Sequence, residues 1–379
     1  MTAPRLTNED VFTLLAQTMA ICDGDIDLFL EVMEVLIERN LVRWPVARPT
    51  INFNNHFDGA MADDTAIHKF RFTLGQLEVL VVKLHLPAHI VTPSLDSVEA
   101  LEALALLCRR LAEPSRLFTV GTEFGRSIEA CSRIINEVVR LIYERFTNTI
   151  YIHETLLQRR AELYANAIRL KSSLQGLRTC LGFIDGTKRY VSRPGARPRE
   201  DAQPFENSQR SLYNGHPRRH CFNYQAVVVP NGLIIRMYGP VEGRRHDATV
   251  LAMRKILDVL KGNPTLRQFC LYGDPAHNCG DCISCPFPTS DPGSQEALFN
   301  SSMSSVREVV EWSFHILKSL WAFLNFDKKM MVRMSPIGKL WLVATLLTNC
   351  HTCFKPKGNQ ISMFFDVLPP SLDGYLCNE

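Results

Sequence analysis

The stretch Cys180-Leu-Gly-Phe-Ile-Asp185-Gly-Thr187 decides how we interpret the fold. Five mostly apolar residues lead into an acidic residue and a glycine follows it. This pattern predicts a buried strand that ends at Asp185 and a turn at Gly186. A carboxylate inside a buried strand would be costly to desolvate, whereas one at the exit of a strand can face a cleft. The alternative is an aspartate that caps a tight turn.

The apolar segments that follow this strand predict a mixed sheet. Residues 220–229 and 233–238 have the composition of strands, and Pro230-Asn-Gly232 between them is a hairpin signal. A helix at 246–260 and a short apolar run at 269–272 come next. An antiparallel set of three strands, followed by strands joined through helices, is the order of a ribonuclease-H-like α/β fold with a mixed sheet flanked by helices.

The first half of the chain predicts helices. Residues 117–125, a turn at Arg126-Ser127 and residues 128–146 have the outline of a helix-turn-helix, although any small helical bundle has such corners. Arg133 and Arg140 continue the spacing of seven from Arg126, so these three could face DNA or form an ordinary solvated face. The divisions that we expect are 1–65 (helical lead-in and connector), 66–178 (helical region), 179–354 (α/β domain) and 355–379 (a loosely ordered tail).

Three capping signals predict where helices start. Each combines a residue that can accept a hydrogen bond from the first turn with Glu or Gln three residues later. The helix that starts at the last signal is expected to run to about Leu324, and a final apolar helix is expected at 337–353. The three pairs are Thr73 with Gln76, Asp96 with Glu99, and Ser305 with Glu308.

The composition is that of a globular protein. The chain has 379 residues, of which 46% are hydrophobic and 21% charged. It contains no run of 18 apolar residues, so we expect no membrane span, and its N-terminus has no basic and apolar pattern of a secretory signal. The twelve cysteines are scattered and are expected to be reduced thiols.

The charge is unevenly distributed, although the formal net charge is only +3. Between Lys188 and Arg219 there are eight Lys or Arg residues and three acidic ones. A basic excess beside a carboxylate site favours a polyanionic partner. A solvated basic loop would show the same composition.

Three acidic residues are the candidates for catalysis. Asp185 and Asp274 each follow a short apolar strand, and Glu311 lies in the second turn of its predicted helix, where no cap requires it. Converging carboxylates repel one another, and a bound divalent cation relieves the repulsion. Oxygen ligands suit Mg²⁺ or Mn²⁺, and two such ions about 4 Å apart can activate a water or a 3′-hydroxyl and stabilise the leaving oxygen.

Four motifs carry a resemblance to a known family. GFIDGT at 182–187, GRRHD at 243–247, YGDPA at 272–276 and FNSSMSSVREVVEWSFHILK at 299–318 together resemble the motif series of PIF/Harbinger-type DDE transposases. That group includes domesticated relatives described as DDE superfamily endonucleases. The 36 residues between Asp274 and Glu311 fit the spacing of this group.

The resemblance implies a nuclease that acts on double-stranded DNA in the nucleus, with a Myb-like partner protein in many members. Asp185, Asp274 and Glu311 would hold the metal ions, two being expected, and a homo-oligomer is conceivable. His246 and Asp247 would support this site, whereas Arg307 and Lys318 would contact phosphate. The remaining candidates for DNA contacts are basic residues near the motifs: Lys188, Arg189, Arg218, Arg219, Arg244 and Arg245.

Two positions depart from the family pattern. His277 stands where an aromatic residue usually follows the second aspartate, and His315 stands where glycine is frequent. Both positions are close enough to the acids to alter substrate fit. They favour an alternative in which the chain is a domesticated, non-catalytic protein that binds DNA or a Myb-like partner.

Cysteine and histidine residues near the second aspartate leave a further alternative open. His277, Cys279, Cys282 and Cys285 could contribute to a zinc site, with Cys350 and Cys353 as a second ligand pair. A structural zinc needs four converging ligands, and the spacing in this loop gives no clear pair. Free thiols are therefore the simpler interpretation. Trp312, Trp321 and Trp341 lie on helical patterns and are expected in the core.

Overall fold

The computed structural model describes residues 8–38, 50–172, 177–194, 208–244, 247–274, 280, 282–332 and 334–376. The chain divides into two compact units, Met1–Thr50 and Ile51–Glu379. The first contains α1 (Asn8–Ile21) and α2 (Ile26–Glu38). Asp25 caps α2, because its Oδ1 accepts hydrogen bonds from the backbone N–H groups of Asp27 and Leu28.

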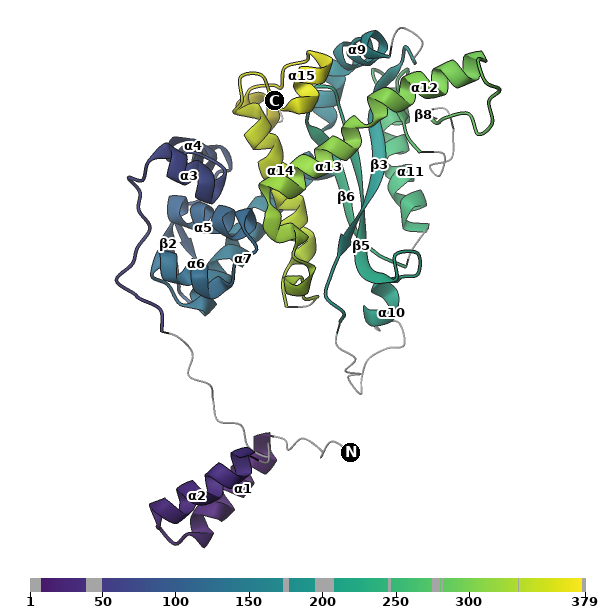
Figure 1. Ribbon diagram of the computed structural model, residues 1–379. Coiled ribbons are helices and arrows are strands. Elements are labelled where there is room, and N and C mark those ends of the chain that lie inside the picture. The colour runs from purple at the N-terminus through teal and green to yellow at the C-terminus, as the bar shows by residue number, and fades with distance from the viewer. Residues whose placement is uncertain are drawn as a thin grey trace. The chain divides into compact units, whose positions relative to one another are not determined.

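The second unit begins with a helical region and a two-stranded antiparallel sheet. Its elements are α3 (Asp63–Phe70), α4 (Leu74–Lys83), β1 (His89–Val91), β2 (Ser97–Glu99), α5 (Ala100–Ala112), α6 (Leu117–Phe124), α7 (Ile128–Arg145), α8 (Thr147–Tyr151) and α9 (Glu154–Lys171). The buried helix α5 lies at the centre of this region, where α3, α4, α6 and α7 pack against it. Figure 1 shows α3, α4, α5, α6 and α7 as one group in dark blue to blue.

One of the two predicted capping boxes in this region is confirmed. Thr73 accepts a hydrogen bond from Gln76 N and Gln76 returns one to Thr73 N at the start of α4. The prediction for Asp96 with Glu99 is wrong, because residues 97–99 form β2 and α5 begins only at Ala100. The Asp96 carboxylate instead accepts hydrogen bonds from Thr92 and Arg133. A tertiary ion pair has replaced the local cap.

The helix, turn and helix expected around residue 126 are present as α6 and α7. Gly125 ends α6 with φ +60°, a backbone conformation that glycine tolerates well, and Ser127 caps α7 through Ala130 N. The three arginines at intervals of seven are in ion pairs: Arg126 with Glu102, Arg133 with Asp96, and Arg140 with Glu137 and Glu144. This pairing favours a solvated, ion-paired face over a DNA-contacting one.

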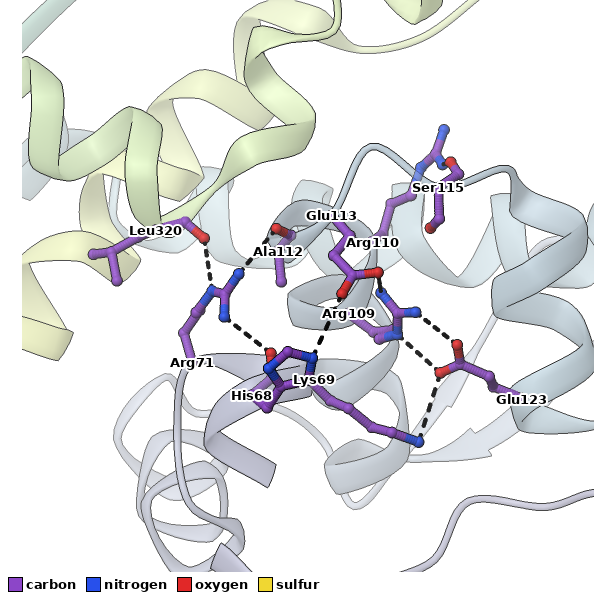
Figure 2. Close-up of polar contacts among 10 residues, drawn as sticks. All are labelled: His68, Lys69, Arg71, Arg109, Arg110, Ala112, Glu113, Ser115, Glu123 and Leu320. Carbon is purple, nitrogen blue, oxygen red and sulfur yellow. Dashed lines mark hydrogen bonds and ion pairs between the residues drawn. The ribbon is translucent and has the colours of Figure 1, made fainter. Parts of the chain in front are cut away.

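Two buried or half-buried arginines tie the helical region together (Figure 2). The side chain of Arg109 is only 7% exposed and donates two hydrogen bonds to Glu123 and one to Glu113. Arg71, which ends α3, donates to the carbonyl oxygens of His68 and Ala112. Its Nε also donates to the carbonyl oxygen of Leu320, 3.1 Å away. The helical region is thereby connected to the end of α13 (Val309–Leu320), the helix that carries Glu311.

The larger sheet is mixed. Its strands are β3 (Cys180–Tyr190), β4 (Tyr213–Asn214), β5 (Arg219–Val228), β6 (Ile234–Glu242), β7 (Cys270–Tyr272) and β8 (Ile283–Ser284). They lie in the order β6-β5-β3-β7-β8, with β4 also paired to β5. The pairs among β6, β5 and β3 are antiparallel, whereas β3, β7 and β8 are parallel. The hairpin expected at Pro230-Asn-Gly232 joins β5 to β6, and Gly232 adopts φ +81° there.

Helices flank this sheet (Figure 1). They are α10 (Ser208–Leu212), α11 (Asp247–Gly262), α12 (Gln295–Arg307), α13 (Val309–Leu320), α14 (Ile337–Cys353), α15 (Gln360–Phe365) and α16 (Leu372–Leu376), with 3₁₀ turns at Ala322–Asn325 and Asp327–Lys329. Helix α14 has the predicted bounds and is buried along most of its length. Its Asn349 side chain accepts a hydrogen bond from the backbone N–H of Ile234 and donates one to the C=O of the same residue. Trp321 and Trp341 are buried as expected.

Two expectations about the last third of the chain are wrong. Ser305 lies inside α12 and does not cap a helix, because Ser294 caps α12 at Ala297 N and a second helix starts at Val309. The segment expected as a loose tail contains α15 and α16, whose Phe365 and Tyr375 are buried. Asn359 and Ser362 form a capping box for α15. In the described part of the chain, no helix is long and apolar enough to cross a membrane.

Candidate active site

The register of two parallel strands brings Asp185 and Asp274 together. Phe183 pairs with Tyr272, and this is the last pair between β3 and β7. Each aspartate lies two residues beyond its member of that pair. Since side chains two residues apart point to the same face of a sheet, the two carboxylates emerge at the same level and on the same side. The sequence prediction that each acid follows a short apolar strand is correct for Asp274.

The prediction that β3 ends at Asp185 is wrong. The strand continues to Tyr190, because residues 183–190 remain paired to β5 after β7 has separated. Asp185 thus lies in the middle of a strand that has lost one of its two neighbours. The carboxylate therefore reaches solvent where β7 has separated from β3, although the backbone makes no turn there. Its side chain is 19% exposed. Its Oδ1 accepts a hydrogen bond from the N–H of Gly186 at 2.7 Å.

Arg307, the last residue of α12, lies between the two aspartates. Its Nη2 is 3.3 Å from Oδ2 of Asp185 and 3.7 Å from Oδ2 of Asp274. Both oxygens are within 3.7 Å of one nitrogen, so they are less than twice that distance apart. The Nε of Arg307 is buried without a hydrogen-bond partner among the described residues. One guanidinium therefore lies against both carboxylates and offsets part of their combined negative charge.

Glu311 lies four residues after Arg307 and is exposed. The prediction that it lies in the second turn of its helix is wrong, because α13 starts at Val309 and Glu311 is in its first turn. Helix α13 packs against β3 and β5, so the glutamate is carried on an element that borders the same sheet. Within the described residues, however, no group of three or more His, Cys, Asp or Glu side chains is close enough to hold a metal ion. The structure thus brings Asp185 and Asp274 together through Arg307 and does not add Glu311 to them.

The fit of a divalent cation to this pair follows from the donors themselves. Two carboxylate groups at one edge of a sheet offer the hard oxygen ligands that Mg²⁺ and Mn²⁺ take. A cationic group already occupies the space between them, which shows that this position favours positive charge. Asp185 and Asp274 therefore fit such an ion, on condition that the Arg307 guanidinium moves away.

Two basic residues expected near DNA are not equally accessible. Arg189 is only 4% exposed, so its expected contact with DNA is not supported by this structure. Its Nη1 donates to Asn325 at 3.4 Å and its guanidinium lies over the ring of Trp341. Burial lowers the pKa of Arg189 to about 10. Burial and then the charge of Arg189 lower the pKa of Lys318, which is half-buried.

A basic cavity of about 820 Å³ lies beyond the far end of β3. Its lining is mostly cationic and contains three residues expected from the sequence to contact DNA, Arg218, Arg219 and Arg244. Its side chains come from the ends of β3, β5 and β6 and from α10. The basic lining residues are Arg193, Arg210, Arg218, Arg219, His220 and Arg244. Arg193 and Arg210 were missed in the sequence, where only their membership of a basic segment pointed to them.

The balance of charge in the basic cavity is strongly positive. Asp327 is the acidic residue of the lining, and it is paired with Arg219. Arg219 also lies over the ring of Tyr190, 4.0 Å from its centroid. A concave surface with this many guanidinium groups attracts phosphate, because arginine binds phosphate oxygens with paired hydrogen bonds. Val191, which directly follows β3, also lines this cavity.

The remaining expected residues are placed as follows. Lys188 is exposed on β3. Asp247 is the first residue of α11, and the structure describes its backbone and not its side chain. Arg245, His246, His277 and Cys279 lie outside the described residues. His315 is exposed beside Ser319. Cys282, Cys285 and Cys350 are buried. Because His277 and Cys279 lie outside the described residues, the structure does not test the alternative of a zinc site.

Comparison with known proteins supports the endonuclease class. Residues 184–349 match the family model of the DDE superfamily endonucleases. The match begins next to Asp185 and ends in α14, so it includes both aspartates, Arg307 and Glu311. No curated protein and no solved structure matches the chain. The matched segment supports a nuclease of the transposase type acting on DNA.

Proposed function

We propose that this chain is a metal-dependent DNA endonuclease or transposase of the DDE type, related to the PIF/Harbinger group. It would hydrolyse phosphodiester bonds of double-stranded DNA in the nucleus and could also join strands. The observation that carries this proposal is the register of β3 and β7, which sets Asp185 and Asp274 side by side within a segment that matches the endonuclease family. The strand order β6-β5-β3-β7-β8 supports a ribonuclease-H-like core.

Each residue of the site has a role in this proposal. Asp185 and Asp274 would hold Mg²⁺ or Mn²⁺, and Glu311 would complete the ligand set after a movement at the junction of α12 and α13, where Glu308 separates the two helices. When bound, two such ions would activate the attacking oxygen and stabilise the leaving one. Arg307, released from the aspartates, would be free to contact a phosphate of the substrate.

The basic cavity would hold the DNA at a distance from the scissile bond. Val191 follows β3 directly and is six positions after Asp185, which corresponds to roughly 20 Å of extended chain. Duplex DNA advances 3.4 Å per base pair, so this length corresponds to about six base pairs. DNA that follows β3 would place one phosphate at the aspartates and others in the basic cavity.

Cleavage of DNA tests this proposal. Purified protein should nick supercoiled or inverted-repeat DNA with Mg²⁺ or Mn²⁺, and Asp185→Asn, Asp274→Asn or Glu311→Gln should abolish the nicking while the far-UV circular dichroism stays unchanged. Glu308→Gln is the matched control, since Glu308 is an exposed glutamate only three residues from Glu311. Nicking that persists in all three variants would show that these acids are not the metal ligands.

One observation favours a second function. Arg307 occupies the space between the aspartates, and no three acids converge among the described residues. A domesticated protein that binds DNA or a Myb-like partner without cutting would have this arrangement. Tight binding of duplex DNA in Mn²⁺, without any nicked product over many hours, would favour this function over catalysis.

A further inference from the structure

The hairpin of α1 and α2 combines an acidic face with exposed apolar side chains. Residues 8–38 contain eight Asp or Glu residues and no Lys, Arg or His. The large apolar residues that are nevertheless exposed include Met19 (66%), Ile21 (80%) and Ile26 (72%). Among the described side chains of the hairpin, those that are buried are Thr18, Cys22 and Met33. Two helices with so little shared core gain little stability from each other.

The sequence of α2 explains why apolar residues remain exposed. With a rotation of about 100° per residue, Asp27, Glu31, Glu34 and Glu38 fall within about 60° of one another. The apolar residues occupy an arc of about 220°, from Val35 and Leu28 on one flank to Ile26 and Leu30 on the other. One neighbouring helix covers about 100° of such a surface. Helix α1 packs against α2, and the middle of this arc is where Met33 is buried and Phe29 half-buried, whereas both flanks stay exposed.

We propose that this hairpin is the docking site for a basic amphipathic helix of a partner protein. We call the exposed residues Ile26, Leu28, Leu30 and Val35 the apolar flanks of α2. A partner helix would bury its apolar side against one flank, and its Lys or Arg residues would lie beside the acidic face of α2. This is the helix-in-groove mode of recognition, with a third or fourth helix completing a bundle.

The charge of the hairpin argues for this occupant over others. A second copy of the hairpin would bring eight further acidic residues to the interface without a single base. A membrane surface is anionic on its cytoplasmic side and attracts helices that are rich in Lys and Arg, which this segment lacks. A basic partner helix gains from both the apolar burial and the charge. This inference is independent of the nuclease function, because it uses no residue after Glu38.

Binding of a synthetic helix to the full chain tests the proposal. The probe is a fluorescent peptide about five helical turns long, with Leu at i, i+3, i+4 and i+7 and Lys at the other positions. Two control peptides keep its length: one carries Glu in place of Lys, and one has the same composition with the leucines dispersed. We expect saturable binding of the first peptide and at least tenfold weaker binding of both controls.

Two double variants distinguish binding to the apolar flanks from non-specific binding to exposed apolar side chains. Ile26→Ser with Leu30→Ser leaves the charge unchanged and should weaken binding at least tenfold. Val79→Ser with Val82→Ser removes two exposed valines of α4 and should leave binding unchanged. Equal binding by the flank variant and the wild type would overturn the proposal. A wild-type dimer that becomes monomeric in the flank variant would also overturn it, because a second copy would then be the occupant.

Discussion

Asp185 and Asp274 occupy equivalent positions on two parallel strands, two residues beyond the pair Phe183 and Tyr272, and both contact Nη2 of Arg307. The resemblance of the surrounding motif to a transposase had suggested that Arg307 contacts phosphate. In the structure the arginine instead lies between the two carboxylates that are proposed to hold a metal ion. Binding of a metal ion there would require the release of Arg307, because both cations would need the same oxygens.

The first prediction concerns this competition. Arg307→Gln removes the positive charge between the aspartates, so Mn²⁺ should bind the protein more tightly, by roughly fivefold, which corresponds to about 1 kcal/mol for a partly exposed ion pair. The measurement is a titration of Mn²⁺ followed by electron paramagnetic resonance, without DNA. It reports metal binding directly and does not depend on nuclease activity.

A lysine and a distant arginine provide the controls for this titration. Arg307→Lys keeps the charge and should stay closer to the wild-type affinity. Arg140→Gln removes an arginine that is paired to Glu137 and Glu144 and should leave the affinity unchanged. If Mn²⁺ bound Arg307→Gln more weakly than the wild type, the arginine would support the site and not compete for it.

The second prediction compares two arginines that each pair with two glutamates. Arg109→Ala should destabilise the protein by about 3 kcal/mol, because Arg109 is 7% exposed and its loss leaves Glu123 partly buried without its two hydrogen bonds. Arg140→Ala should cost less than about 1 kcal/mol, because that arginine is 44% exposed. Urea unfolding followed by circular dichroism gives both values. Similar losses in the two variants would contradict the importance of burial.

Much of the fold was predictable because local patterns and tertiary structure agree. Helix α14 is apolar all round and has the predicted bounds, and the turn at Pro230-Asn-Gly232 fixes the hairpin of β5 and β6. The continuation of β3 past Asp185 was not predictable. Asp-Gly is a common turn signal, but pairing with β5 along residues 183–190 overrides it.

The candidate site was predictable in part for a similar reason. The position of Asp274 follows from a strand end that the sequence marks, and that of Asp185 follows from the apolar strand residues that precede it. The contact of Arg307 with both does not, because it depends on where α12 ends, and the signal at Ser305 pointed to a helix start inside that helix. The burial of Arg189 could not be predicted from a local pattern either. Its guanidinium contacts Asn325 and lies over the ring of Trp341, and both residues are far from Arg189 in the sequence.

The third prediction concerns acid stability. Burial, followed by the charges of Lys355 and Arg71, lowers the pKa of His351 from its ordinary 6.5 to about 4. As the pH falls, the unfolded chain binds this proton first, so the stability is fully present above pH 6.5 and is lost between pH 6.5 and 4. The loss should reach about 2 kcal/mol at pH 4.5.

A ring substitution isolates the contribution of His351. His351→Phe keeps an aromatic ring at the edge-on contact with Phe72 and cannot be protonated, so its unfolding free energy should fall less between pH 7 and 4.5 than that of the wild type. The difference should be about 2 kcal/mol. His56→Gln, at an exposed histidine, should follow the wild type. A curve for His351→Phe that parallels the wild type would show that His351 does not titrate in this window.

The fourth prediction distinguishes two surfaces that could bind DNA. Arg218→Gln with Arg244→Gln removes two charges from the basic cavity, whereas Arg133→Gln with Arg140→Gln removes two from the outer face of α7. Both pairs change the net charge equally. Each phosphate contact that is lost reduces the slope of log K against log salt by about 0.9.

Binding of a fluorescent duplex without divalent metal, between about 50 and 200 mM salt, separates the two surfaces. The slope of log K against log salt should be smaller for the cavity variant by the amount expected for about two lost phosphate contacts. The α7 variant should keep the wild-type slope, because Arg133 and Arg140 are already paired to acids. The reverse result would assign DNA binding to the helix-turn-helix outline of α6 and α7. It would also remove the reason for expecting DNA to follow β3 from Asp185 to the basic cavity.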